Sequence, residues 1–139
     1  MNVIFYDIKN NIRYNKKLFR KVKLEYVLRK SDFLVICCDL NDKSRSLIRY
    51  NEMNKMKNTA YLINVARGPI LKEKDLIKSL HRNIIAGAAL DVFEYEPIKK
   101  QNSLKKVPNC ILGSHNAFNT VDETERVNKK TLQNLIKYL

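Results

Sequence analysis

Short apolar runs that alternate with segments of helical spacing constrain the fold of this 139-residue chain most strongly. The runs lack strict apolar–polar alternation, which is typical of strands that are covered on both faces of a sheet. We expect such strands at 2–6, 33–38, 61–65, 85–92 and 110–112. Helical spacing predicts helices at about 23–30, 50–56, 72–81 and 120–139. Strands and helices in alternation predict an α/β fold with a doubly wound parallel sheet.

The basic stretch 9–22 has no clean period, so we expect a loop or a short strand there. The helix at 120–139 carries a capping box, because Thr120 can cap its first turn and the Glu123 side chain can reach back. Its apolar residues share one face, which we expect to point inward: Leu132, Leu135, Ile136 and Leu139.

The chain is strongly basic, with 27 lysines and arginines against 14 acidic residues and a net charge of +13. The excess is greatest between Lys9 and Lys30, where nine basic residues face one acid. This charge would suit a nucleic acid, but no aromatic-interleaved motif or recognition helix accompanies it. A coding bias toward Lys, Asn and Ile explains the excess equally well. We therefore expect no nucleic-acid partner.

Membrane spans and secretion are not expected either. Apolar runs such as 33–38 are far shorter than the roughly 20 residues of a spanning helix, and the first residues form no basic leader. The three cysteines include the adjacent pair Cys37 and Cys38, which makes a poor disulfide framework and favours a reducing, cytoplasmic setting. The cysteines also lack metal-ligand spacing, so we expect no metal site and interpret Cys37 as a small core residue.

Polar side chains gather where the predicted strands end. In a parallel sheet, ligands bind beyond the carboxyl ends of the strands. The residues at those ends are Asp7, Cys38, Asp39, Ala66, Arg67, Gly68, the segment 91–96, Ser114 and His115. Any one of them alone is more often a turn or cap residue. Carboxylates, an arginine and a histidine on one rim together indicate a site.

Several motifs on these strand ends are typical of a known family. The first is Asn-Val-Ala-Arg-Gly-Pro at 64–69, together with the preceding segment 56–63. The second is Ala-Gly-Ala-Ala-Leu-Asp-Val-Phe-Glu-Tyr-Glu-Pro at 86–97, and the third is Ile-Leu-Gly-Ser-His-Asn at 111–116. With these motifs the chain resembles the D-isomer-specific 2-hydroxyacid dehydrogenases, and most of all the phosphoglycerate dehydrogenase-like members. The resemblance covers nearly the whole chain. It implies a Rossmann-like NAD-binding domain and hydride transfer between NAD(H) and a D-2-hydroxy acid or 2-oxo acid.

The resemblance also implies which residues are catalytic. The family's arginine, glutamate and histidine match Arg67, Glu96 and His115. Loss of hydride from a hydroxy acid requires a base for the hydroxyl proton, and histidine suits that role near neutral pH. A carboxylate beside the ring would favour the imidazolium form and fix the ring's orientation. A planar guanidinium can hold the substrate's carboxylate in a fork.

For the cofactor, Asp7 matches the family carboxylate that binds the adenine ribose, which favours NAD over NADP, although nearby Lys9 leaves NADP open. Cys38, Asp39 and Leu40 match the adenine-side segment, which more often reads His-x-Pro in the family. The remaining cofactor-binding positions implied by the resemblance are Val65, Ala66, Arg67, Asp91 and His115.

The three glycines are too far apart for a glycine-rich phosphate loop. Relative to the family, the first strand, the Gly-rich turn and the first helix are absent, so we expect residues 1–139 to be a partial NAD-binding domain without a substrate-binding domain. We expect the fragment to be inactive alone and of low stability, or to associate through the apolar edges at 2–7 and 33–38. The complete protein would be a homodimer that acts on a small 2-hydroxy or 2-oxo acid. The alternative is a non-catalytic nucleotide- or protein-binding module.

Overall fold

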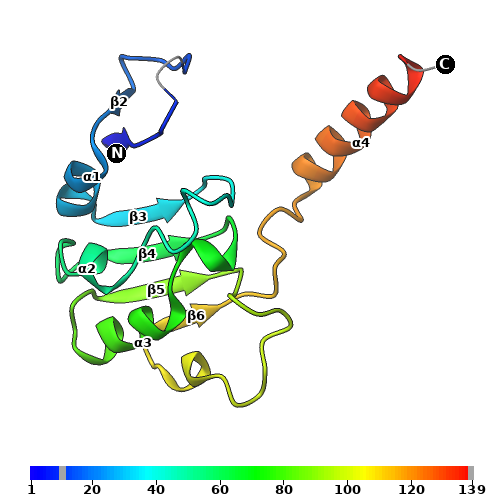
Figure 1. Ribbon diagram of the computed structural model, residues 1–139. Helices are drawn as coiled ribbons and strands as arrows, with labels where there is room; N and C mark the ends of the chain where they lie inside the picture. Colours follow the sequence, from blue (N-terminus) through cyan, green and yellow to red (C-terminus); the bar gives the residue numbers. More distant parts are fainter. Residues whose placement is uncertain (10–11, 138–139) are drawn as a thin grey trace.

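The computed structural model, which describes residues 1–9 and 12–137, contains a four-stranded and a two-stranded parallel sheet (Figure 1). The strands are β1 (Val3–Phe5), β2 (Phe19–Lys21), β3 (Phe33–Ile36), β4 (Tyr61–Asn64), β5 (Gly87–Leu90) and β6 (Cys110–Leu112). The helices are α1 (Leu24–Lys30), α2 (Tyr50–Met53), α3 (Glu73–His81) and α4 (Val121–Ile136), with two 3-10 turns, η1 (Gly68–Ile70) and η2 (Ser103–Lys106). Each predicted strand and helix is present, although β1, β3, β4, β5 and α2 are shorter than predicted. Residues 138–139 of the last predicted helix lie outside the described residues.

The larger sheet has the order β3-β4-β5-β6, and all its strands are parallel. The register aligns Leu34 with Leu62, Leu62 with Ala88, and Leu90 with Leu112. Its four arrows point the same way in Figure 1. The segments that follow β3, β4, β5 and β6 therefore start from one edge of the sheet, as the doubly wound pattern requires.

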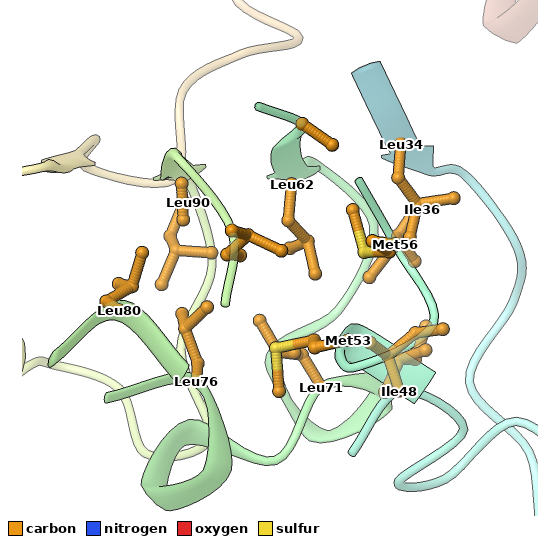
Figure 2. Close-up of a cluster of buried hydrophobic side chains, with 14 of the residues drawn as sticks. Leu34, Ile36, Ile48, Met53, Met56, Leu62, Leu71, Leu76, Leu80 and Leu90 are labelled. Carbon is orange, nitrogen blue, oxygen red and sulfur yellow. The ribbon is translucent and has the colours of Figure 1, made fainter. Parts of the chain in front are cut away.

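The core lies between one face of this sheet and the helices α1, α2 and α3. Figure 2 shows side chains of the strands opposite those of the helices and their flanking segments. Buried residues of the cluster are Leu34, Ile36, Leu62 and Leu90 from the strands, and Val27, Leu28, Met53, Leu76 and Leu80 from the helices. The helical spacing that predicted α1 and α3 therefore marks the faces that pack on the sheet.

The second face of the four-stranded sheet is uncovered by any element within the described residues. Burial alternates along β3 and β4, so that Phe33, Val35 and Tyr61 are exposed between buried neighbours. Ile111 of β6 points to the same side, because it is in register with Ala89 and through it with Ile63 and Val35. The prediction that both faces are covered is wrong here. The pattern showed correctly that both faces are apolar, but not whether this chain covers them.

The strand β1 pairs with β2 in a separate sheet and not with β3. The basic stretch thus supplies a short strand, β2, one of the two outcomes predicted for 9–22. Because β3 is the terminal strand of its sheet, its free edge and the exposed Val35 agree with the prediction that the segments at 2–7 and 33–38 pair differently or expose apolar edges.

The helix α4 extends away from both sheets (Figure 1). The Thr120 side chain accepts a hydrogen bond from the Glu123 backbone at 3.2 Å, as predicted, but the Glu123 carboxylate pairs with Arg126 and does not reach back. The predicted inward face is wrong for Leu132, Leu135 and Ile136, which are exposed, and Leu139 lies outside the described residues. Segment 113–120 leads the helix away from the sheet, so its apolar side meets no described residue. No helix in the described ranges has the length and apolar character needed to cross a bilayer.

Candidate functional site

Three neighbouring strands deliver the predicted catalytic residues to one edge of the sheet. Arg67 follows β4, Glu96 follows β5 and His115 follows β6. Since β4, β5 and β6 are adjacent and parallel, their following segments begin side by side. The fold thus brings together residues that are widely separated in the sequence.

The centre of this edge is a histidine–carboxylate pair. The Nδ1 atom of His115 lies 2.7 Å from Oε2 of Glu96. The other carboxylate oxygen, Oε1, accepts a hydrogen bond from the Phe93 backbone N–H at 2.9 Å. Burial tends to raise the pKa of Glu96, but the hydrogen bonds from Phe93 and His115 and the charge of Arg67 together lower it. Glu96 is therefore held as an ionised acceptor in a fixed orientation.

The backbone of His115 is unusual for a residue with a side chain, with a φ of 59°. Left-handed backbone is uncommon outside glycine, although histidine is among the residues that tolerate it best. The ring also meets Phe118 edge to face, with centroids 6.4 Å apart. Glu96 on one side and Phe118 on another restrict how the imidazole can turn.

A buried asparagine shapes the turn that presents Arg67. The Asn64 amide donates to the Arg67 carbonyl at 3.2 Å, and its Oδ1 accepts from the Ala66 backbone N–H at 3.1 Å. The Arg67 guanidinium itself is exposed and donates through Nη1 to the Ala66 carbonyl at 2.7 Å. One N–H group of the guanidinium is thus used locally, and the exposed group carries further donors.

A glycine allows the β4 and β5 loops to approach closely. A Cβ on Gly68 would lie 1.8 Å from the Phe93 carbonyl oxygen, closer than any real side chain can come. Only glycine fits at this crossing, which sets the loop carrying Arg67 directly against the loop that leads to Glu96.

The β5 loop is further tied to the start of α3. The Glu94 backbone N–H donates to the Glu73 carboxylate, while the Glu94 carboxylate lies 3.1 Å from the Lys72 ammonium. The Asn102 amide donates to the second Glu73 oxygen at 3.3 Å. These contacts fix the segment 93–96 independently of any ligand.

Asp91 holds the loop that carries His115. Asp91 is buried, with 9% of the residue exposed, and its Oδ2 atom accepts a hydrogen bond from the Ala117 backbone N–H at 2.7 Å. A Cβ on Gly113 would lie 2.3 Å from Oδ1 of the same carboxylate, so glycine is needed for this approach as well. Asp91 thus supports the geometry of the histidine loop.

An open cleft of about 400 Å³ lies between the segments that follow β3 and β4. It is lined by Cys37, Cys38, Asp39, Leu40, Ala66 and Arg67. Five of these six residues are predicted cofactor-binding positions. The exception is Cys37, whose predicted place in the core is wrong because β3 ends at Ile36 and the chain turns outward there.

Asp7 lies close enough to this cleft to affect the thiol of Cys38. Burial and the negative charges of Asp39 and Asp7 raise the pKa of Cys38, so that its thiol stays protonated at neutral pH. The Asp7 carboxylate accepts a hydrogen bond from the Lys9 backbone N–H at 2.7 Å. Val65, at the end of β4, is exposed on the same edge. Within residues 1–9 and 12–137, no cluster of three or more histidine, cysteine or acidic side chains could hold a metal ion.

The histidine–carboxylate pair, the arginine and the cleft lie at the carboxyl edge of a parallel sheet, which is where folds of this class bind their ligands. The family model described as the D-isomer specific 2-hydroxyacid dehydrogenase NAD binding domain matches residues 1–117. The chain belongs to this family, and residues 1–117 correspond to its NAD-binding domain.

Individual relatives agree with this assignment. A glyoxylate reductase of Thermofilum pendens is 37% identical over the whole chain, which covers 42% of that protein. The NAD-complexed D-isomer specific 2-hydroxyacid dehydrogenase of Lactobacillus delbrueckii ssp. bulgaricus has a TM-score of 0.83 at 26% identity, over 99% of this chain and 45% of that one. An acyclic imino acid reductase in complex with NADPH and D-Arg has a TM-score of 0.88 at 27% identity, over 99% and 43%. The chain thus spans about two fifths of the relatives it matches.

The residues around the cleft fit part of the NAD molecule that domains of this family bind. Arg67 lines the cleft, the charge of Asp7 reaches Cys38 in its wall, and Leu40 gives it apolar lining. Sequence reasoning identified these residues, and it placed Gly68 and the segment 91–96 at the strand ends, but it did not find which residues position the others. These are Asn64, Gly68, Phe93, Gly113 and Phe118. The polar Asn64 at the end of an apolar strand was the one signal that could have revealed such a role.

Proposed function

We propose that this chain is the cofactor-binding and proton-transferring part of an NAD-dependent dehydrogenase that interconverts D-2-hydroxy acids and 2-oxo acids. The observation that carries the proposal is the 2.7 Å contact between His115 and Glu96, on the same sheet edge as Arg67. The family membership supplies the reaction class. The residues of the edge supply the chemistry expected of each position.

His115 takes the hydroxyl proton. With Nδ1 bound to the ionised Glu96, the other ring nitrogen, Nε2, is left to accept that proton as the C2–O bond becomes a carbonyl. In the reverse direction His115 returns the proton to the carbonyl oxygen. Glu96 is a positioning residue, since it orients the ring and stabilises the imidazolium that forms.

Arg67 binds the substrate's carboxylate. Its exposed guanidinium keeps donors that are not used by Ala66, and a two-pronged contact with a carboxylate would align the acid beside His115. The substrate class follows from this pairing: a small anion with oxygen on the carbon next to its carboxylate. Glyoxylate is the smallest acid of that kind.

NAD, when bound, would supply the hydride acceptor or donor for C2. Asp7 would bind its adenine ribose, and the segment 38–40 would line its adenine side. Val65, Ala66 and Asp91 would lie along the nicotinamide side. The carboxylate of Asp7 would repel a ribose phosphate, which is the reason to propose NAD rather than NADP.

The remaining proposals concern the whole protein. We infer that residues 1–139 form part of one NAD-binding domain and that turnover requires a substrate-binding half that these residues do not contain. A homodimer of the complete protein stays a prediction. The three unpaired cysteines support a reducing, cytoplasmic location.

The test supplies the part of a relative that this chain does not cover. The chain is joined to the unmatched part of the glyoxylate reductase of Thermofilum pendens, and NADH oxidation with glyoxylate is followed. We expect His115→Ala to lower kcat by roughly 10²–10⁴-fold, and Arg67→Ala to raise KM. His81→Ala and Arg82→Ala, exposed residues at the end of α3, are the matched controls and should leave both constants unchanged.

Two results would count against the proposal. Unchanged rates in both the His115 and the Arg67 variants would show that the assigned roles are wrong. A chimaera that binds NADH but does not turn over glyoxylate, hydroxypyruvate or pyruvate would favour the non-catalytic binding module.

A further inference from the structure

The two walls of the cleft belong to no helix or strand. The first wall, residues 37–40, follows β3, and the second wall, residues 66–67, follows β4. Segments without regular hydrogen bonding keep a fixed shape only where other residues restrain them. The chain between β3 and α2 contains two such restraints, at Ser44 and Ser46.

Ser44 holds the first wall. It is buried, and its Oγ atom donates a hydrogen bond to the Asp39 carbonyl at 2.6 Å while it accepts one from the Asn41 backbone N–H at 2.8 Å. The Asn41 side chain in turn accepts from the Ser44 backbone N–H at 3.1 Å. A buried hydroxyl is costly to leave unpaired, so these bonds fix Ser44 and Asp39 to each other. Asp39 itself lines the cleft.

Ser46 holds the second wall. Its backbone N–H donates to the Pro69 carbonyl at 2.8 Å, two residues after Arg67 in the sequence. Ser46 has a φ of 52°, a left-handed conformation that few residues with a side chain adopt. The Arg49 side chain fixes this turn, because its Nε atom donates to the Ser46 carbonyl at 2.8 Å. Strained backbone persists only where its surroundings hold it in place.

Ile48 anchors the same segment in the core. Its backbone N–H donates to the Ile70 carbonyl at 3.1 Å, and its carbonyl accepts from the Lys72 N–H at 3.0 Å. The bridge therefore pairs Ile48 with Leu71, and both side chains are buried. Residues 44–48, which we term the clip, are thus bonded to both walls of the cleft and to the core.

We propose that the clip sets the spacing of the two cleft walls and thereby the affinity for the cofactor. Ser44 and Ser46 are positioning residues, since they act through Asp39 and through the segment from Arg67 to Pro69. Walls that are already in place bind a ligand without the cost of ordering them. The inference rests on the proposed function in one respect, namely that NAD occupies this cleft, and it adds which residues outside the cleft control its binding.

The first experiment measures the Kd of NADH by fluorescence titration of the chimaera described above. We expect Ser44→Ala to raise the Kd roughly fivefold, as the loss of one restraining hydrogen bond would, and Ser44→Thr to retain most of the affinity because it keeps the hydroxyl. The KM for NADH should rise with the Kd. The kcat at saturating NADH should stay nearly unchanged, because His115 and Glu96 lie on other loops.

Ser79→Ala is the matched control. Ser79 is a buried serine whose Oγ atom donates to the Asp75 carbonyl at 2.8 Å within α3. The variant loses the same kind of bond as Ser44→Ala, but away from the cleft. It should leave the Kd of NADH unchanged, and urea midpoints show how much stability each variant loses.

The second experiment tests the left-handed turn at Ser46. Glycine adopts a positive φ readily and keeps the backbone N–H, so Ser46→Gly should leave the Kd of NADH unchanged. A β-branched residue is strongly disfavoured there, so Ser46→Val should shift the turn and raise the Kd roughly fivefold.

The outcomes separate this proposal from the proposed function. An unchanged Kd in Ser44→Ala or in Ser46→Val would overturn the role of the clip, whether or not the chimaera turns over glyoxylate. An equal rise in Ser79→Ala would overturn it too, because the effect would then follow general stability. A chimaera that shows the expected changes in Kd but no turnover would support the clip and contradict the proposed reaction alone. A wild-type chimaera that binds no NADH would overturn both.

Discussion

The Nδ1 atom of His115 lies 2.7 Å from Oε2 of Glu96, although the two residues are 19 positions apart and follow different strands. Glu96 also accepts a hydrogen bond from the backbone of Phe93. The carboxylate therefore connects the β5 loop to the β6 loop. Replacement of Glu96 should affect both the orientation of the histidine and the stability of the edge.

The lowered pKa of Glu96 predicts how stability depends on pH. A carboxyl whose pKa is lower in the folded than in the unfolded chain adds stability above its ordinary value near 4.5, and this stability is lost as the pH falls through the folded value. We expect the urea midpoint of the wild type to exceed that of Glu96→Gln at pH 7, and the difference to shrink as the pH falls below 4.5. Glu125→Gln, an exposed change on α4, is the control and should follow the wild-type curve. A difference that is constant with pH would contradict the prediction.

The contact of Gly68 with Phe93 predicts a steep cost for a single methyl group. Gly68→Ala would place a Cβ 1.8 Å from a backbone carbonyl oxygen, so the two loops must separate. We expect a loss of about 1–3 kcal/mol in the free energy of unfolding, measured in urea. Gly87→Ala is the comparison, since its nearest backbone atom lies at 2.8 Å, and it should cost less. Equal losses would mean that the crossing of the loops is not as tight as described.

The buried carboxylate of Asp91 predicts a local change around His115. Asp91→Ala removes the acceptor of the Ala117 N–H, which should free the loop between Gly113 and Thr120. Amide exchange at Ala117 should accelerate at least tenfold, while exchange in α3 stays unchanged. Asp91→Asn keeps an oxygen acceptor, so its exchange rate at Ala117 should lie between those of the wild type and Asp91→Ala. Faster exchange throughout the molecule would instead point to global destabilisation.

The sequence predicted the positions of the strands and helices well because apolar spacing reports directly which side chains need burial. It could not say what covers them. Leu132 and Ile136 of α4, and Phe33 and Ile111 of the sheet, have the composition of buried residues, yet no described part of this chain packs on them. An apolar pattern specifies a need for contact, and the partner that meets it can be another polypeptide.

The candidate site divides in a similar way. Arg67, Glu96 and His115 were found through motifs, and parallel topology then requires that their loops start from one edge. The residues that set their geometry left weaker signals, because Phe93 contributes a backbone N–H and Gly68 contributes the lack of a side chain. Cys37 was misplaced for a local reason, since the strand ends one residue before it.

The three cysteines should differ strongly in reactivity. Their alkylation rates test how far Cys37 and Cys38 in the cleft and Cys110 in β6 are buried. Burial raises the pKa of Cys110 to about 11, and the nearby charge of Glu73 adds to this. The thiolate is the reactive form, so at pH 8 Cys110 should be alkylated by iodoacetamide roughly 100-fold more slowly than an ordinary exposed thiol. Cys37, which is exposed in the cleft, should react first, and Cys38 should react more slowly because its pKa is raised as well.

Peptide mass spectrometry over a time course resolves the three sites. The Cys110→Ala variant is the control, because it should leave the rate at Cys37 unchanged. Fast labelling of Cys110 in the folded chain would show that β6 is not packed as described.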